Sequence, residues 1–87
     1  MEIQYSEKAI KQIKKIHKGD RKNSGLILKT IESYAENPSG KFDIKMLKGK
    51  YGDFKRLRVG DYRVIFEDIG NVIFIYDIKH RQEAYHD

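Results

Sequence analysis

The sequence predicts an α+β fold: an N-terminal short strand and a helical hairpin packed on one face of a mainly antiparallel β-sheet. Apolar residues recur at helical spacing between residues 7 and 36, and the period changes to two after Pro38. The size agrees, because 87 residues without cysteine can form one small core but no disulfide framework. We therefore expect one domain over residues 1–87.

A strand and a helix are predicted at the N-terminal end. Residues 2–5 alternate polar and apolar side chains, which is typical of a strand. Ser6 can then cap a helix over residues 7–18, which Gly19 ends. Lysines fall largely on the face of this helix opposite to its apolar residues, so we expect that face in solvent.

A second helix is predicted to follow almost at once. Asp20 can cap it, Ile27 and Ile31 belong to its buried stripe, and Asn37-Pro38 ends it because the residue before a proline avoids the helical region. The short connection makes the two helices an antiparallel hairpin, whose apolar stripe must cover one face of a sheet. The other face of the sheet is then open.

Four strands are predicted after Pro38. They span residues 42–47, 54–59, 62–68 and 72–78. Gly60-Asp61 is the two-residue connection of a tight hairpin. Residues 72–76 are apolar on both faces, which predicts a central position for the last strand.

Arginine side chains are predicted to gather on the open face. If Leu57 faces the helices, Arg56 and Arg58 face the open side, and Arg63 joins them from the next strand. Pairing around Gly60-Asp61 sets Arg58 beside Arg63, and adjacent like charges destabilise a sheet. The arrangement is explained if the site receives an anion, because guanidinium binds phosphate bidentately. The alternative is that each arginine pairs with a nearby carboxylate.

The charge distribution and the polar tail point the same way. The net charge is +5, and residues 1–22 and 48–63 each carry +4. Such a balance indicates a polyanionic partner such as nucleic acid or, alternatively, a solvated lysine-rich surface. The tail from Lys79 to Tyr85 brings imidazole, guanidinium, carboxylate and phenol groups to the end of the last strand. It is either a frayed terminus or part of the site.

Three motifs lie in the second half of the chain. They are Leu47-Lys48-Gly49, Arg56-Leu57-Arg58-Val59-Gly60-Asp61-Tyr62-Arg63-Val64-Ile65-Phe66 and His80-Arg81-Gln82-Glu83-Ala84-Tyr85. Together they resemble the RelE/ParE superfamily of toxin–antitoxin toxins, most of all the RelE-type mRNA interferases. The resemblance covers nearly the whole chain, and it implies the microbial RNase-like fold and an activity that needs no metal or other cofactor.

The resemblance also implies roles for individual residues. Arg63 matches a phosphate-stabilising arginine, Arg81 a catalytic arginine, and Tyr85 a tyrosine that stacks on or orients the nucleotide. Arg56 stands where RelE proper has a lysine, and because arginine keeps its proton, His80 becomes a candidate for proton transfer. The expected catalytic residues are Arg56, Arg63, Arg81, Tyr85 and His80. The expected RNA-binding residues are Lys48, Lys50, Lys55 and Arg58.

The implied function is that of a toxin of a type II toxin–antitoxin system that cuts mRNA in the ribosomal A site and so inhibits translation. The cut is a transesterification in which the ribose 2′-OH attacks its own 3′ phosphate. One alternative is a ParE-like, non-catalytic inhibitor of DNA gyrase, which has the same fold. Another is an inactive member that only binds its antitoxin.

The expected partners are a RelB-like antitoxin, which is acidic or carries an amphipathic helix, and the ribosome with its mRNA. No membrane is expected. The N-terminus has no apolar signal segment, and no stretch approaches the ~18 apolar residues of a transmembrane helix, so the predicted location is cytoplasmic.

Overall fold

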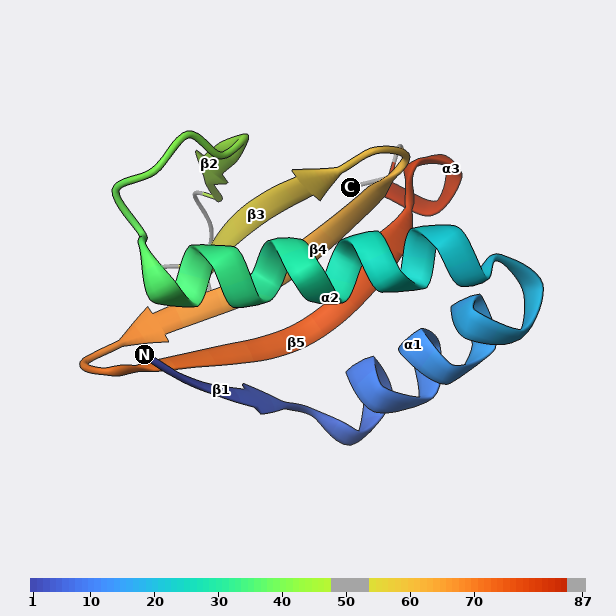
Figure 1. Ribbon diagram of the computed structural model, residues 1–87, viewed down its shortest axis with the longest axis horizontal. Coiled ribbons are helices and arrows are strands. Elements are labelled where there is room, and N and C mark those ends of the chain that lie inside the picture. Colours follow the sequence, from blue (N-terminus) through green and yellow to red (C-terminus); the bar gives the residue numbers. More distant parts are fainter. Residues whose placement is uncertain (48–53, 85–87) are drawn as a thin grey trace.

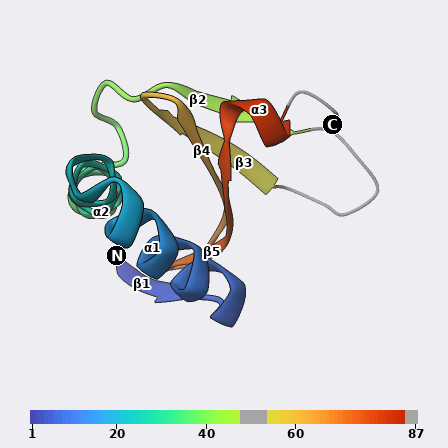
Figure 2. The ribbon, with the colours of Figure 1, turned by 90° about the vertical axis from the view of Figure 1, so that its right-hand side faces the viewer.

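The fold is a five-stranded sheet with two helices on one side, in a computed structural model that describes residues 1–47 and 54–84 (Figure 1). The elements are β1 (Glu2–Tyr5), α1 (Glu7–Gly19), α2 (Arg21–Glu36), β2 (Ile44–Met46), β3 (Phe54–Val59), β4 (Tyr62–Ile69), β5 (Val72–His80) and α3 (Arg81–Ala84). Figure 2 shows α1 and α2 together on one side of the sheet, with α3 away from them. The predicted α+β class is confirmed.

Side-chain caps fix where the two long helices begin. The Ser6 hydroxyl accepts a hydrogen bond from the Ala9 amide at 3.0 Å, and the Asp20 carboxylate accepts one from the Asn23 amide at 3.2 Å. Such caps satisfy amides that lack a partner in the first turn of a helix. Asp20 is the single residue between α1 and α2, so the predicted helical hairpin is confirmed.

The strands follow the order β1-β5-β4-β3-β2. β1 runs parallel to β5, and every other neighbouring pair is antiparallel. The prediction of a central last strand is therefore wrong by one place: β5 is flanked on both sides, but the middle strand is β4. The apolar pattern of the sequence cannot tell which of β4 and β5 is the middle strand, because each has a neighbouring strand on both sides.

Apolar residues from both layers form the core between the helices and the sheet. The largest fully buried apolar side chains are those of Phe66, Ile27, Ile31, Ile73 and Ile75. Burying each one stabilises the fold by about 1.5–3 kcal/mol. This packing confirms that the apolar stripe of the hairpin covers one sheet face and leaves the other uncovered by α1 and α2.

A β-bulge next to Phe66 changes the alternation of β5. Because of it, Ile75 and Ile78 are both buried although they lie three residues apart. Lys79 is then the cross-strand neighbour of Arg63, on the open face. The strand continues to His80, two residues beyond the predicted end, and the tail that follows begins with the short helix α3.

Helix α1 covers the part of β5 that β1 does not reach. The pairing of β1 with β5 ends at Tyr5 and Ile75. Farther along, Gln12 accepts a hydrogen bond from the Ile78 amide and donates one to Asp77, both at 2.7 Å. This protects a free strand edge and holds the end of β5 against the helix. No helix of the described residues is long and apolar enough to cross a membrane.

Candidate functional site

Three arginines border a shallow hollow at the end of the β3–β4 hairpin, on the open face of the sheet. Its volume is about 180 Å³, and it is lined by Arg58, Gly60, Asp61, Arg63 and Arg81. We call this site the arginine hollow. Its residues come from two neighbouring strands, the turn between them and the first residue of α3.

The tight turn of the hairpin brings two of these arginines side by side. Gly60 has φ +57°, whereas Asp61 has a negative φ, so glycine occupies the one position that needs the left-handed region. The register that follows pairs Arg58 with Arg63 directly. This confirms the prediction that Arg58 and Arg63 are cross-strand neighbours.

The arginine hollow carries an excess of positive charge. Among residues 1–47 and 54–82, Arg58 and Arg63 have no carboxylate within 4.0 Å of their guanidinium nitrogens. Arg81 lies 3.8 Å from the Asp61 carboxylate, with both side chains more than half exposed, so this ion pair is weak. Like charges on neighbouring strands destabilise a sheet, and a bound anion would offset their repulsion.

Asp61 holds the third arginine in place through its backbone. The Asp61 carbonyl accepts a hydrogen bond of 2.6 Å from the Arg81 amide, which fixes the start of α3 against the hairpin turn. From the sequence, Asp61 is predicted as a turn residue and as one of the carboxylates that could pair with an arginine. Its position directly after Gly60 is the signal that could have placed a carboxylate at the site.

Arg56 lies on the same face but outside the arginine hollow. Its guanidinium contacts the Asp43 carboxylate at 3.3 Å, and only 12% of its side chain is exposed. The expected convergence of Arg56 with Arg63 and Arg81 is therefore not observed. The alternative, in which an arginine pairs with a carboxylate, applies to Arg56 because the loop before β2 brings Asp43 beside it.

Lys55 lies on the face of the sheet that the helices cover. Its ammonium group lies 3.5 Å from the Asp68 carboxylate, which also accepts a hydrogen bond of 3.0 Å from the Tyr34 hydroxyl. Burial and this carboxylate raise the pKa of Tyr34 to about 12. The predicted RNA contact of Lys55 is thus on the other side of the sheet from the arginine hollow.

His80 also belongs to the helix-covered side. Its ring packs edge-on against Tyr62, with centroids 5.2 Å apart, and its Nδ1 atom accepts a hydrogen bond of 3.3 Å from the Gln82 amide. The structure does not bring His80 to the arginine hollow, because the alternation of β5 continues through this residue. Tyr85, Lys48 and Lys50 lie outside the described residues.

Aromatic residues occupy the other end of the open face. The ring of Tyr76 contacts Phe54 edge-on at 5.2 Å and stacks on Phe74 at 6.4 Å. Its hydroxyl donates a hydrogen bond of 2.9 Å to Glu67, and this bond, with burial and the carboxylate charge, raises the pKa of Tyr76. This group was not predicted from the sequence, although Phe74 and Tyr76 lie at alternate positions of β5.

Solved structures similar to this chain include toxins of toxin–antitoxin systems. The chain is similar to the YoeB dimer from Staphylococcus aureus, with a TM-score of 0.78, 22% identity, and coverage of 92% of this chain and 95% of that one. It is also similar to the archaeal RelE–RelB complex from Pyrococcus horikoshii OT3, with a TM-score of 0.71 and 27% identity, over 92% and 93% of the two chains. The fold is that of RelE and YoeB toxins.

The sequence gives the same result. The chain is 31% identical over 85 residues to Toxin RelE3 of Methanocaldococcus jannaschii, which covers 98% of this chain and 96% of that protein. Residues 3–85 match the family described as ParE toxin of type II toxin-antitoxin system, parDE. The chain belongs to this toxin family, and the resemblance to the RelE/ParE superfamily is confirmed.

Proposed function

We propose that this toxin is a ribosome-dependent mRNA endonuclease that inhibits translation by a metal-free transesterification. The observation that carries the proposal is the pair Arg58 and Arg63, which lie side by side on an open sheet face with no carboxylate partner among the described residues. Arg81 adds a third guanidinium to the same hollow. A phosphodiester is the ligand whose charge and geometry suit such a group.

The reaction itself needs charge stabilisation at phosphorus. The 2′-oxygen forms a bond to the adjacent phosphorus, and the bond to the 5′-oxygen of the next nucleotide breaks. The products are a 2′,3′-cyclic phosphate and a 5′-hydroxyl. The pentacovalent intermediate carries more negative charge than the diester, so guanidiniums already in place stabilise it more than they stabilise the substrate.

A proton must also leave the 2′-hydroxyl, and one must reach the departing 5′-oxygen. Arginine cannot accept a proton from the hydroxyl because it keeps its own. Among the described residues lining the arginine hollow, Asp61 has a side chain able to accept it, and we propose that carboxylate as a candidate base. The resemblance assigns Tyr85 to the reaction, and this role remains a prediction. His80 was offered only as a substitute for the lysine that Arg56 replaces, and its position on the helix-covered side does not favour that role.

Primer extension on ribosomes programmed with a defined mRNA tests this function. We expect Arg63→Ala and Arg81→Ala to lower the single-turnover cleavage rate about 10²–10³-fold, the loss typical of removing one donor to a developing charge. Asp61→Asn should lower the rate, because an amide cannot accept the proton of the 2′-hydroxyl. Lys29→Ala is the matched control, because it removes an exposed cation from α2, outside the arginine hollow.

Intact mRNA under conditions in which a RelE control cuts would reject the proposal. Cleavage that is unchanged in both arginine variants would reject the arginine hollow as the reacting site. Thermal unfolding of each variant should accompany the assay, because a variant that fails to fold gives no information about cleavage.

A second candidate is inhibition of DNA gyrase without catalysis. The observation that favours it is the match of residues 3–85 to the family of ParE toxins. The shared fold cannot separate the two activities. Accumulation of gyrase-cleaved double-stranded DNA with intact mRNA would select this function over the first.

We also propose a cognate antitoxin, encoded next to this chain, as the protein partner. The net charge of +5 and the open face with its arginine hollow suit an acidic segment or an amphipathic helix. The similar toxin from Pyrococcus horikoshii OT3 was solved as a RelE–RelB complex. Co-purification with only neutral or basic proteins would contradict this proposal.

A further inference from the structure

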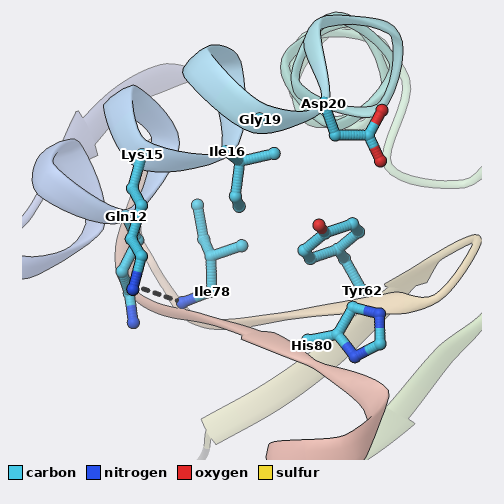
Figure 3. A pocket seen from close by; sticks show the side chains of 8 residues that line it. All are labelled: Gln12, Lys15, Ile16, Gly19, Asp20, Tyr62, Ile78 and His80. Carbon is cyan, nitrogen blue, oxygen red and sulfur yellow. Dashed lines mark hydrogen bonds between the residues drawn. The ribbon is translucent and has the colours of Figure 1, made fainter.

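A second cavity lies on the helix-covered side of the sheet, between the end of α1 and the ends of β4 and β5 (Figure 3). Its volume is about 470 Å³, within the ~300–1,000 Å³ of typical small-molecule sites. The arginine hollow lies at the same end of the sheet but on its opposite face. Nothing in the proposed cleavage reaction uses this second cavity.

The walls of the cavity suit a flat ring. Ile16 from α1 and Ile78 from β5 supply apolar surface, and Figure 3 shows the Tyr62 ring beside Ile78 and below Asp20. His80 packs edge-on against Tyr62, with an angle of 86° between the rings, and so limits how that ring can turn. Single-stranded RNA is commonly bound by stacking an unpaired base on such an aromatic side chain.

The cavity is also lined by polar side chains, among them Asp20 and Lys15. Asp20 lines the cavity, and its carboxylate accepts two hydrogen bonds, both from Asn23. A carboxylate can accept about four, so it retains acceptor capacity. Guanine presents two adjacent donors, N1–H and N2–H, to one carboxylate, whereas uracil presents one. Lys15 at the rim supplies a cation for a phosphate.

The neighbouring residues connect this cavity to the arginine hollow. Tyr62 directly precedes Arg63, and His80 directly precedes Arg81, so each ring of the cavity adjoins an arginine of the hollow in the chain. A single RNA strand that passes around this end of the sheet can therefore contact both sites. The exposed lysines of α1 add positive charge beside the cavity.

We propose that this cavity binds one unpaired guanine of an RNA strand, stacked on Tyr62 and hydrogen-bonded by Asp20. The inference deepens the proposed function, because it names a base that the toxin would read beside the cleaved phosphate, and it rests on that function for the source of the base. The recognition chemistry is shared with a free guanine nucleotide.

The test is an NMR titration of the isotope-labelled full chain, without ribosomes. The probes are GMP, UMP, and a short oligouridine with or without one guanine. GMP should bind at least about tenfold more tightly than UMP, equivalent to ~1.4 kcal/mol, and should shift the signals of Ile16, Tyr62 and Ile78. The guanine-containing oligonucleotide should shift the same signals, and the oligouridine should not.

Two variants, each with one carboxylate changed to an amide, test the role of Asp20 in base preference. Asp20→Asn keeps a residue that caps a helix well, so α2 should stay folded. We expect this variant to lose the preference for GMP over UMP. Glu36→Gln is the matched control, because it makes the same chemical change at an exposed residue outside the cavity and should keep the preference.

Four results would overturn the inference: no GMP binding at about 10 mM, signal shifts confined to the arginine hollow, equal affinity for UMP, or a preference that survives Asp20→Asn. Binding of GMP without binding of the guanine-containing oligonucleotide would overturn the assignment to RNA. Guanine binding with intact mRNA in the ribosome assay would reject the proposed endonuclease and leave the site standing. Cleavage of mRNA without guanine binding would reject the guanine site and leave the proposed endonuclease standing.

Discussion

At the scale of single residues, Asp68 joins two polar side chains under the helices. It accepts the hydrogen bond from Tyr34 and lies beside the Lys55 ammonium group. Because Tyr34 is only 5% exposed, burial opposes its ionisation, and the nearby carboxylate adds to this effect. The neutral phenol therefore belongs to the folded state.

The pH dependence of Tyr34→Phe should reveal this contribution. The raised pKa means that the stabilisation by the phenol is fully present below pH ~10, the unfolded value, and is lost as the pH rises through about 12. At pH 7 the variant should lose about 1 kcal/mol of unfolding free energy. Urea titrations at several pH values should show the gap between the two proteins shrinking above pH ~10. Parallel profiles would contradict the assignment.

Residue-level predictions succeeded where strand alternation decides the outcome. Arg58 and Arg63 are neighbours as expected, because one turn fixes their register. Arg56 was misjudged because its partner, Asp43, comes from a loop 13 residues away. His80 was read as part of a polar tail, although hydrogen bonding extends β5 to this residue and keeps its side chain on the core face.

At the scale of elements, two glycines lie in different backbone conformations. Gly25 lies within α2, and Gly60 begins the β3–β4 turn with φ +57°. A Cβ atom at either position would meet no heavy atom within 4 Å among the described residues. Any effect of adding one must therefore come from the backbone rather than from a clash.

The substitutions Gly25→Ala and Gly60→Ala should shift stability in opposite directions. Alanine in the helix should raise the unfolding free energy by about 0.5–1 kcal/mol, because it restricts the unfolded chain. Alanine in the turn should lower it by about 1–2 kcal/mol, because a side chain is strained at positive φ. Urea unfolding of both variants measures the pair, and each serves as the control for the other. Effects of the same sign would refute the backbone explanation.

Elements with strong local signals were predicted to within two residues. Capping residues and the Asn37-Pro38 stop mark both long helices, and β3 has the predicted bounds. The strand β2 is shorter than expected, since Phe42 lies before it, and α3 was not foreseen. Short elements such as these depend on tertiary contacts, here the bond between the Arg81 amide and Asp61, which no periodicity reports.

At the scale of the whole molecule, positive charge lies on both sides of the sheet. The lysines of α1 are exposed on the side of the helices, and the arginine hollow lies on the open face. The fold class could be predicted from the sequence, because the change from a helical period to a period of two shows which segments form the helices and which form the sheet. The second cavity did not, because it depends on how the end of α1 packs over β4 and β5.

This charge should make association with an acidic antitoxin depend on salt. We expect the association rate constant to fall about tenfold or more between 50 and 500 mM salt in stopped-flow mixing, as electrostatic steering is screened. Arg58→Gln should weaken that dependence, whereas a matched change outside the interface should not. A rate constant independent of salt would show that apolar contacts govern the encounter.

The parallel pairing of β1 with β5 joins the two ends of the chain. The Ser6 hydroxyl bonds to the Tyr76 carbonyl, 70 residues later, so the first strand has no neighbour in the sheet until the last has been synthesised. Contacts of such separation form late in folding. We therefore expect the toxin fold to be completed only after β5 has been synthesised, so that the nascent chain lacks the finished sheet until that point.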